Sequence, residues 1–159
     1  MDTQHVHVDK QTPDAYRAMV TVATAVTKSA REAGLSRSLT ELVNVRVSQI
    51  NGCASCLDVH NARAAAAGVT DKQLATLSVW RDTELFDDRE QAALRLAEIT
   101  TTLPDHDTAE REYARARKVL TDDELSAVVW VATAINAFNR VSILSRHPVR
   151  PYADHNTVT

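Results

Sequence analysis

The chain of 159 residues is predicted to fold as a single all-α domain. Alanine is abundant, whereas the sequence holds only 3 glycines and 4 prolines, and aromatic residues make up 4%. This composition favours helices over a strand-rich fold. Capping residues followed by apolar residues at helical spacing also recur along the chain. We therefore expect one compact domain of about six to seven helices, with a core at about 13–147 and polar tails at 1–11 and 148–159.

The first predicted helix begins at Thr12-Pro13, because threonine is a common cap and proline is tolerated at the first helical position. Apolar residues then fall on one stripe, and Gly34 is expected to end the helix. Later helices show similar signals, either a capping pair at the start or a glycine or proline at the end. They are expected at about 53–67, 70–80, 87–102, 108–120 and 121–145.

The second element is ambiguous. Ser38 and Glu41 have the spacing of a capping box, which predicts a helix that ends at the Asn-Gly pair before the cysteines. Val43, Val45 and Val47 alternate as in a β-strand, yet the leucines around them also fit helical spacing. The cap and the helical context on both sides favour a helix.

Charge and hydropathy exclude several functional classes. The net charge of -3 comes from interspersed acids and bases, so we expect neither a nucleic-acid partner nor a basic membrane-binding patch. No apolar run is long enough to span a bilayer, and the first ten residues lack the features of a signal peptide. A cytoplasmic location is therefore expected. In a reducing compartment a C-x-x-C motif is more often catalytic or metal-binding than a structural disulfide.

Both cysteines and one histidine share a short segment. Cys53, Cys56 and His60 are spaced i, i+3 and i+7, so in a helix they lie on one face. A helix N-terminus favours a thiolate, and a nearby imidazole can accept the proton. A thiolate that attacks a peroxide oxygen forms a sulfenic acid, which a second thiol converts to a disulfide. Glu41, twelve residues before Cys53, would contact His60 if the two helices pack as a hairpin.

The spacing of Glu41, Cys53, Cys56 and His60 resembles the signature E-x11-C-x-x-C-x-x-x-H of the alkylhydroperoxidase D-like proteins, within the carboxymuconolactone decarboxylase superfamily. Three segments resemble blocks of that family: SQINGCASCLDVH, WRDTELFDDREQAALRLAEITT and ELSAVVWVATAINAFNR. The resemblance covers roughly residues 13–147. It implies an all-helical fold and a homo-oligomer, commonly a trimer or hexamer, and calls for no cofactor and no metal.

The resemblance also implies roles for individual residues. Cys56 would attack the peroxide, and Cys53, nearer the surface, would resolve the sulfenic acid and meet the reductant. Glu41 and His60 would form a proton relay. The implied function is a peroxidase that reduces alkyl or hydrogen peroxides, with a lipoylated or thioredoxin-like protein as the dithiol reductant. Ser55 departs from the pattern, because the family usually has a larger residue there.

Each site residue also has a simpler interpretation. Glu41 would then be only the third residue of a capping box, and His60 only a histidine of the core. Cys53 and Cys56 could instead bind zinc, with His60 and Glu41 completing four ligands, although three ligands on one helix face give awkward geometry. At the level of function, the alternative is a non-enzymatic redox sensor or binding oligomer that uses the same dithiol.

Other polar and aromatic residues are weaker candidates. Glu98 is a possible second buried acid near the site, placed below the others. Trp80 and Trp130 are expected to pack in the core or at an interface. The remaining histidines are expected to lie in termini or loops with nothing nearby to complete a site; these are His5, His7, His106, His147 and His155.

Overall fold

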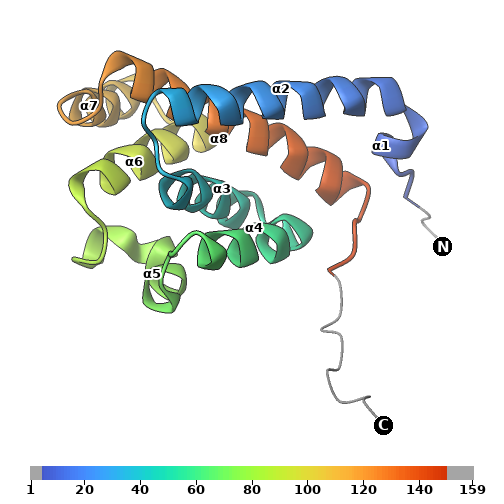
Figure 1. The fold of residues 1–159 in the computed structure, drawn as a ribbon, viewed down its shortest axis with the longest axis horizontal. Helices are drawn as coiled ribbons and strands as arrows, with labels where there is room; N and C mark the ends of the chain where they lie inside the picture. The colour runs from blue at the N-terminus through green and yellow to red at the C-terminus, as the bar shows by residue number, and fades with distance from the viewer. Residues whose placement is uncertain (1–4, 150–159) are drawn as a thin grey trace, which may run out of the picture.

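Every regular element of residues 5–149, which the computed structural model describes, is a helix (Figure 1). In chain order they are α1 (Val8–Gln11), α2 (Pro13–Glu32), α3 (Arg37–Asn51), α4 (Ala54–Ala66), α5 (Asp71–Thr76), the 3-10 helix η1 (Leu77–Asp82), α6 (Asp88–Thr102), α7 (His106–Arg117) and α8 (Asp122–Leu144). The all-α prediction is confirmed. The short α1 was not expected, because it lies in the predicted N-terminal tail, and most of the predicted C-terminal tail, with His155, lies outside the described residues.

Side-chain caps explain where most of these helices begin. Thr70, Asp87 and Thr121 each form a complete capping box, at the starts of α5, α6 and α8. Each satisfies amides that a helix start leaves without partners. The helix predicted at 70–80 is divided, because α5 ends at Thr76 and the chain continues as the 3-10 helix η1, within which Val79 leaves helical geometry. Helix α7 begins earlier than expected, since Asp105 caps it.

The predicted capping box of α3 is wrong. Ser36, not Ser38, caps this helix, and its hydroxyl accepts a hydrogen bond of 3.1 Å from the amide of Leu39. Glu41 is consequently the fifth residue of α3 and lies beyond the first turn. It does not serve the cap, which removes the simpler interpretation of that carboxylate.

Helix α3 is the central helix of the fold, packed against α4, α6 and α8 (Figure 1). Its valines alternate because two opposite sides of the helix are buried. Val43 and Val47 join the core formed with α2, α6 and α8. Leu42 and Val45 join a second core, which contains Trp80 and covers the side of α4, α5 and η1. Double burial therefore gives a helix the appearance of a strand in the sequence.

Helix α8 is the longest helix of the described chain and packs against α2, α3 and α6. By length and composition it is the one described helix apolar enough to cross a membrane. Here it behaves as a core helix, because its apolar side fills the larger core. It also carries two buried amides, Asn136 and Asn139, which bond to other helices.

Candidate active site

The two cysteines lie at the start of α4. Cys53 is the N-cap residue and Cys56 is the third residue of the helix, as the spacing predicted. A disulfide joins them, with their Cα atoms 5.3 Å apart. No side chain caps the first amides of α4, unlike those of α3 or α8. The unpaired amides give this helix start a partial positive charge, which stabilises a thiolate once the disulfide is reduced.

The expected order of exposure of the two cysteines is wrong. Cys53 has an exposed fraction of 0%, whereas Cys56 is exposed by 7%. The reason is the turn before α4, in which Gly52 adopts a left-handed conformation (φ 68°) and the amide of Cys53 donates to the carbonyl of Ser48 at 3.0 Å. This turn directs Cys53 inward, and Cys56 in the following helix keeps the small exposed surface.

Cys53 nevertheless lines a pocket of about 190 Å³. The pocket lies between the start of α4, including Ser55, and the end of α8, where Ser142 and His147 contribute. The hydroxyl of Ser55 lies 3.7 Å from the sulfur of Cys53. A larger residue at position 55 would occupy part of this space, so serine leaves the approach to Cys53 more open.

Glu41 and His60 meet across the hairpin of α3 and α4, as predicted. The Nδ1 atom of His60 lies 2.7 Å from Oε2 of Glu41, and the amide of Asn44 donates to the same oxygen at 3.3 Å. The side chain of His60 is 13% exposed and that of Glu41 is 9% exposed. His60 is one helical turn after Cys56, so the pair extends the face that carries the thiols into the interior.

Burial alone would raise the pKa of Glu41, but its neighbours reverse that effect. The hydrogen bond and charge of His60, the amide of Asn44 and the charge of Arg63 together hold the pKa of Glu41 below its ordinary value. An ionised Glu41 can only accept a hydrogen bond, so Nδ1 of His60 carries the proton and donates the hydrogen bond to Oε2 of Glu41. The bond therefore fixes the tautomer and orientation of the imidazole and leaves Nε2 for proton exchange.

A cluster of buried amides, which the sequence analysis missed, holds the turn before Cys53. The side-chain amide of Asn51 donates to Oδ1 of Asn136 at 2.8 Å and to Oδ1 of Asn139 at 2.9 Å. Asn139 in turn donates to Ser48, whose carbonyl accepts the amide of Cys53. Two asparagines in the apolar stripe of α8 were the signal that could have indicated it, since buried amides need partners.

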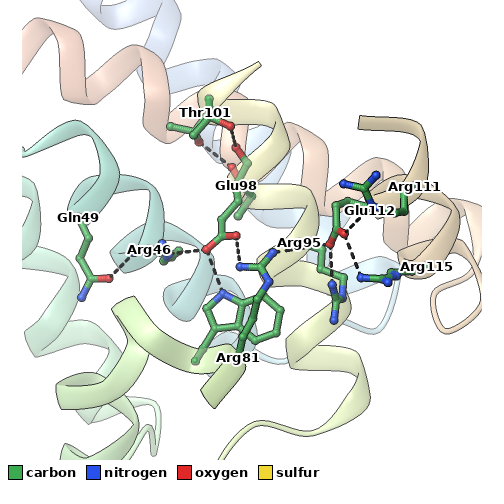
Figure 2. A network of polar contacts seen from close by, with 12 residues as sticks. Arg46, Gln49, Arg81, Arg95, Glu98, Thr101, Arg111, Glu112 and Arg115 are labelled. Carbon is green, nitrogen blue, oxygen red and sulfur yellow. Dashed lines mark hydrogen bonds and ion pairs between the residues drawn. The ribbon is translucent and has the colours of Figure 1, made fainter. Parts of the chain in front are cut away.

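Glu98 is half-buried, and it belongs to an ion-pair network rather than to the thiol site (Figure 2). Its carboxylate accepts from Nε of Arg46 at 2.8 Å and from Nε1 of Trp80 at 3.0 Å, and it also pairs with Arg81. Trp80 lies in the core, as expected. Trp130 lies outside the core, with 54% of its surface exposed, which leaves the other expected place, an interface.

The histidines near the two ends of the described chain do not stand alone, contrary to expectation. His7 and His147 lie together with Asp9, and one ligand atom from each lies within 4.8 Å of the others. Asp9 and His147 are 138 positions apart in the sequence. No local pattern in the sequence could have joined them.

Comparisons with known proteins agree with this fold. Residues 13–98 match the Carboxymuconolactone decarboxylase family. The chain is 33% identical over 116 residues to the uncharacterized protein YdfG of Bacillus subtilis (strain 168), which covers 73% of this chain and 79% of YdfG. It is 38% identical over 64 residues to the uncharacterized protein YnjA of Escherichia coli (strain K12), which covers 40% of this chain and 35% of YnjA.

A solved structure has the same fold over nearly the whole chain. It is ATU0492 from Agrobacterium tumefaciens, a protein of unknown function described as a candidate antioxidant defence protein AhpD. The TM-score is 0.82 at 27% sequence identity, over 93% of this chain and 100% of that one. All four predicted site residues lie within the segment that the family matches. The chain therefore belongs to the carboxymuconolactone decarboxylase family and has the alkylhydroperoxidase D-like fold.

Proposed function

We propose that this protein is a peroxidase that reduces alkyl or hydrogen peroxides through a dithiol–disulfide cycle at Cys53 and Cys56. One observation carries the proposal: a disulfide-forming pair lies at an uncapped helix start, with the Glu41–His60 pair on the same hairpin. The description of ATU0492 as a candidate antioxidant defence protein is a further support.

In the first step the Cys56 thiolate attacks one peroxide oxygen. The O–O bond breaks, Cys56 becomes a sulfenic acid, and the departing alkoxide or hydroxide takes a proton that the Glu41–His60 pair supplies through Nε2 of His60. In the second step Cys53 attacks the sulfenic sulfur, the S–S bond forms, and water leaves. The peroxide is thereby reduced by two electrons and the two thiols are oxidised to the disulfide.

A dithiol reductant must then reduce the disulfide to complete the cycle. We infer a lipoylated or thioredoxin-like protein, because each supplies two thiols and exchanges directly with a disulfide. A reductant that carries its thiols on a narrow arm or loop suits the site, because Cys53 is buried and lines a pocket beside Ser55. The expected location is the cytoplasm, where such reductants are kept reduced.

The chain is expected to form a homo-oligomer, as a trimer or hexamer. The exposed Trp130 supports assembly, because a half-exposed tryptophan in a hollow between α2 and α8 is more stable when a partner covers it. Sedimentation of the purified chain tests this expectation. A monomer at micromolar concentration would contradict it.

Peroxide consumption is the decisive test of the activity. The reduced protein should consume hydrogen peroxide and an alkyl hydroperoxide catalytically when a reduced lipoyl domain or thioredoxin is supplied. Oxidation to the disulfide without turnover in the presence of every dithiol donor would contradict the peroxidase. If oxidation then changed the assembly, the alternative function as a redox sensor would replace it.

A further inference from the structure

A group of possible metal ligands includes His147, which also lines the pocket beside Cys53. The residue preceding α1, His7, contributes one imidazole, Asp9 within α1 contributes a carboxylate, and His147 after α8 contributes a second imidazole. The Nε2 atom of His147 lies 3.1 Å from Oδ1 of Asp9. The rings of His7 and His147 stack with their centroids 5.9 Å apart.

The backbone after α8 places His147 in this position. Arg146 adopts a left-handed conformation (φ 49°), and the amide of His147 donates to the carbonyl of Ser142 at 3.0 Å. The chain therefore turns back on the last turn of α8 instead of continuing along it. The hydroxyl of Ser145 accepts from the amide of Val8 at 3.0 Å, which fixes α1 against the same helix end.

The imidazole of His147 is oriented as a metal ligand requires. Its Nδ1 lies 3.2 Å from the hydroxyl of Ser142, and Nε2 points to Asp9. A hydrogen bond at one ring nitrogen that directs the other to the ligand site is the usual arrangement around a metal-bound histidine. The side chains of His147 and Asp9 are only 25% and 16% exposed, so their positions are held by packing.

We propose that His7, Asp9 and His147 form a binding site for a divalent transition metal of the zinc type. Two imidazoles and one carboxylate are a donor set of catalytic zinc sites, which keep a further position for water. Ligand atoms about 2.0–2.2 Å from zinc lie a little over 3 Å from each other, the separation already present between His147 and Asp9. A rotation of the exposed His7 side chain supplies the third ligand.

The site is separate from the dithiol but shares a wall with it. His147 lines the pocket that reaches Cys53. A bound metal would also join α1 to the end of α8, two elements far apart in the chain. Binding to the folded state alone raises the free energy of unfolding, so the metal should stabilise the fold as well as occupy the rim of the pocket.

Isothermal titration of zinc into the full-length oxidised chain tests the site, because the disulfide prevents the thiols from binding the metal. We expect one zinc ion per chain. Asp9→Asn and His147→Ala should each weaken binding at least tenfold, and Ser142→Ala should weaken it by roughly 10–100-fold through the orientation of His147. His106→Ala, which removes an imidazole from the start of α7, is the matched control and should bind zinc unchanged.

Thermal unfolding provides a second readout that is independent of peroxidase activity. Zinc should raise the Tm of the unmodified chain and of His106→Ala, and should leave the Tm of Asp9→Asn unchanged. Asp9→Asn keeps the size of the side chain, so a folded variant with a normal helical circular dichroism spectrum is expected. The proposal would be overturned if the unmodified chain bound no zinc, or if Asp9→Asn and His147→Ala bound zinc as tightly as the unmodified chain.

Discussion

The Oε2 atom of Glu41 lies 2.7 Å from Nδ1 of His60, which links α3 to α4 beneath the two cysteines. Glu41 is 7% exposed and is not a capping residue, since Ser36 caps α3. Burial raises the pKa of Glu41, but its imidazole partner outweighs burial and brings the pKa below its ordinary value. Glu41 is therefore ionised and held in place by its contacts. Its position suits a group that orients His60.

Glu41→Gln tests that role. Glutamine keeps the size and one hydrogen bond but not the charge, so the thermal stability and assembly should remain close to normal. The rate of peroxide reduction should fall at least tenfold, in the range expected for disabling a general base, and the pKa of the Cys56 thiol should rise. Stopped-flow peroxide reduction and alkylation of the thiol against pH measure the two effects.

Glu90→Gln is the matched control for this substitution. Glu90 is the third residue of the α6 capping box, a position where glutamine caps as well. It should leave the rate unchanged. A Glu41→Gln variant that reduced peroxide as fast as Glu90→Gln would exclude the relay.

The two cysteines should differ in what their removal leaves behind. Cys56→Ser should abolish peroxide consumption, because the attacking thiol is lost. Cys53→Ser should leave one sulfenic acid per chain, which dimedone traps and mass spectrometry detects, because no second thiol resolves it. Alkylation should also give Cys56 a pKa below the 8.5 of a free thiol, owing to the uncapped amides of α4. If dimedone instead trapped a sulfenic acid in Cys56→Ser, and Cys53→Ser consumed no peroxide, the roles of the two cysteines would be exchanged.

The amide cluster should stabilise the turn that carries Cys53. Asn51→Ala removes the donor to Asn136 and Asn139 and leaves their buried oxygens with fewer partners. We expect the free energy of unfolding to fall by about 1–3 kcal/mol, measured by urea denaturation, and the disulfide to reform more slowly after reduction. Asn61→Ala, an asparagine of α4 outside the cluster, should have a much smaller effect. Equal losses from the two substitutions would mean that the cluster does not stabilise the turn.

Local signals predicted most of the fold. The capping pairs that begin at Thr70, Asp87 and Thr121 each lie within four residues of sequence, and each marks the start of a helix in the structure. Ser36 and Ser38 could not be distinguished in this way, because both are good caps and only the packing of α3 decides where its first turn begins.

Contacts across the fold account for what the sequence did not predict. Glu41 and His60 were found because one short hairpin separates them, so the spacing alone brings them together. The contact of Asn51 with Asn139 and that of Asp9 with His147 join positions 88 and 138 residues apart. Periodicity carries no information about such pairs. The burial of Cys53 was likewise decided by the geometry of the turn at Gly52, which the spacing of the cysteines does not reveal.

The ion-pair network around Glu98 should govern part of the stability in acid (Figure 2). Burial raises the pKa of Glu98, but hydrogen bonds from Trp80, Arg81 and Arg46 outweigh it, so the pKa lies below its ordinary value of 4.5. A carboxyl group with a lowered pKa stabilises the folded state above its unfolded pKa. That contribution is lost as the pH falls from 4.5 through the lowered value.

Glu98→Gln should therefore be less stable than the unmodified chain at pH 7, by roughly 1–3 kcal/mol, because Arg46 loses a half-buried charged partner. It should also lose less stability than the unmodified chain between pH 4.5 and lower pH, since one of the titrating carboxylates is gone. Glu112 and Glu124 remain in this variant. Burial raises the pKa of each, but arginine partners and, for Glu124, cap hydrogen bonds outweigh burial and bring the pKa below its ordinary value. The acid dependence should therefore be reduced and not abolished.

Urea denaturation at a series of pH values measures both effects in one data set. Glu32→Gln is the control, because its pair with Lys28 is exposed and such surface pairs contribute little. The control curve should overlay that of the unmodified chain. If the curve for Glu98→Gln ran parallel to that of the unmodified chain at every pH, Glu98 would not titrate differently on folding, and the acid sensitivity would belong to the other carboxylates.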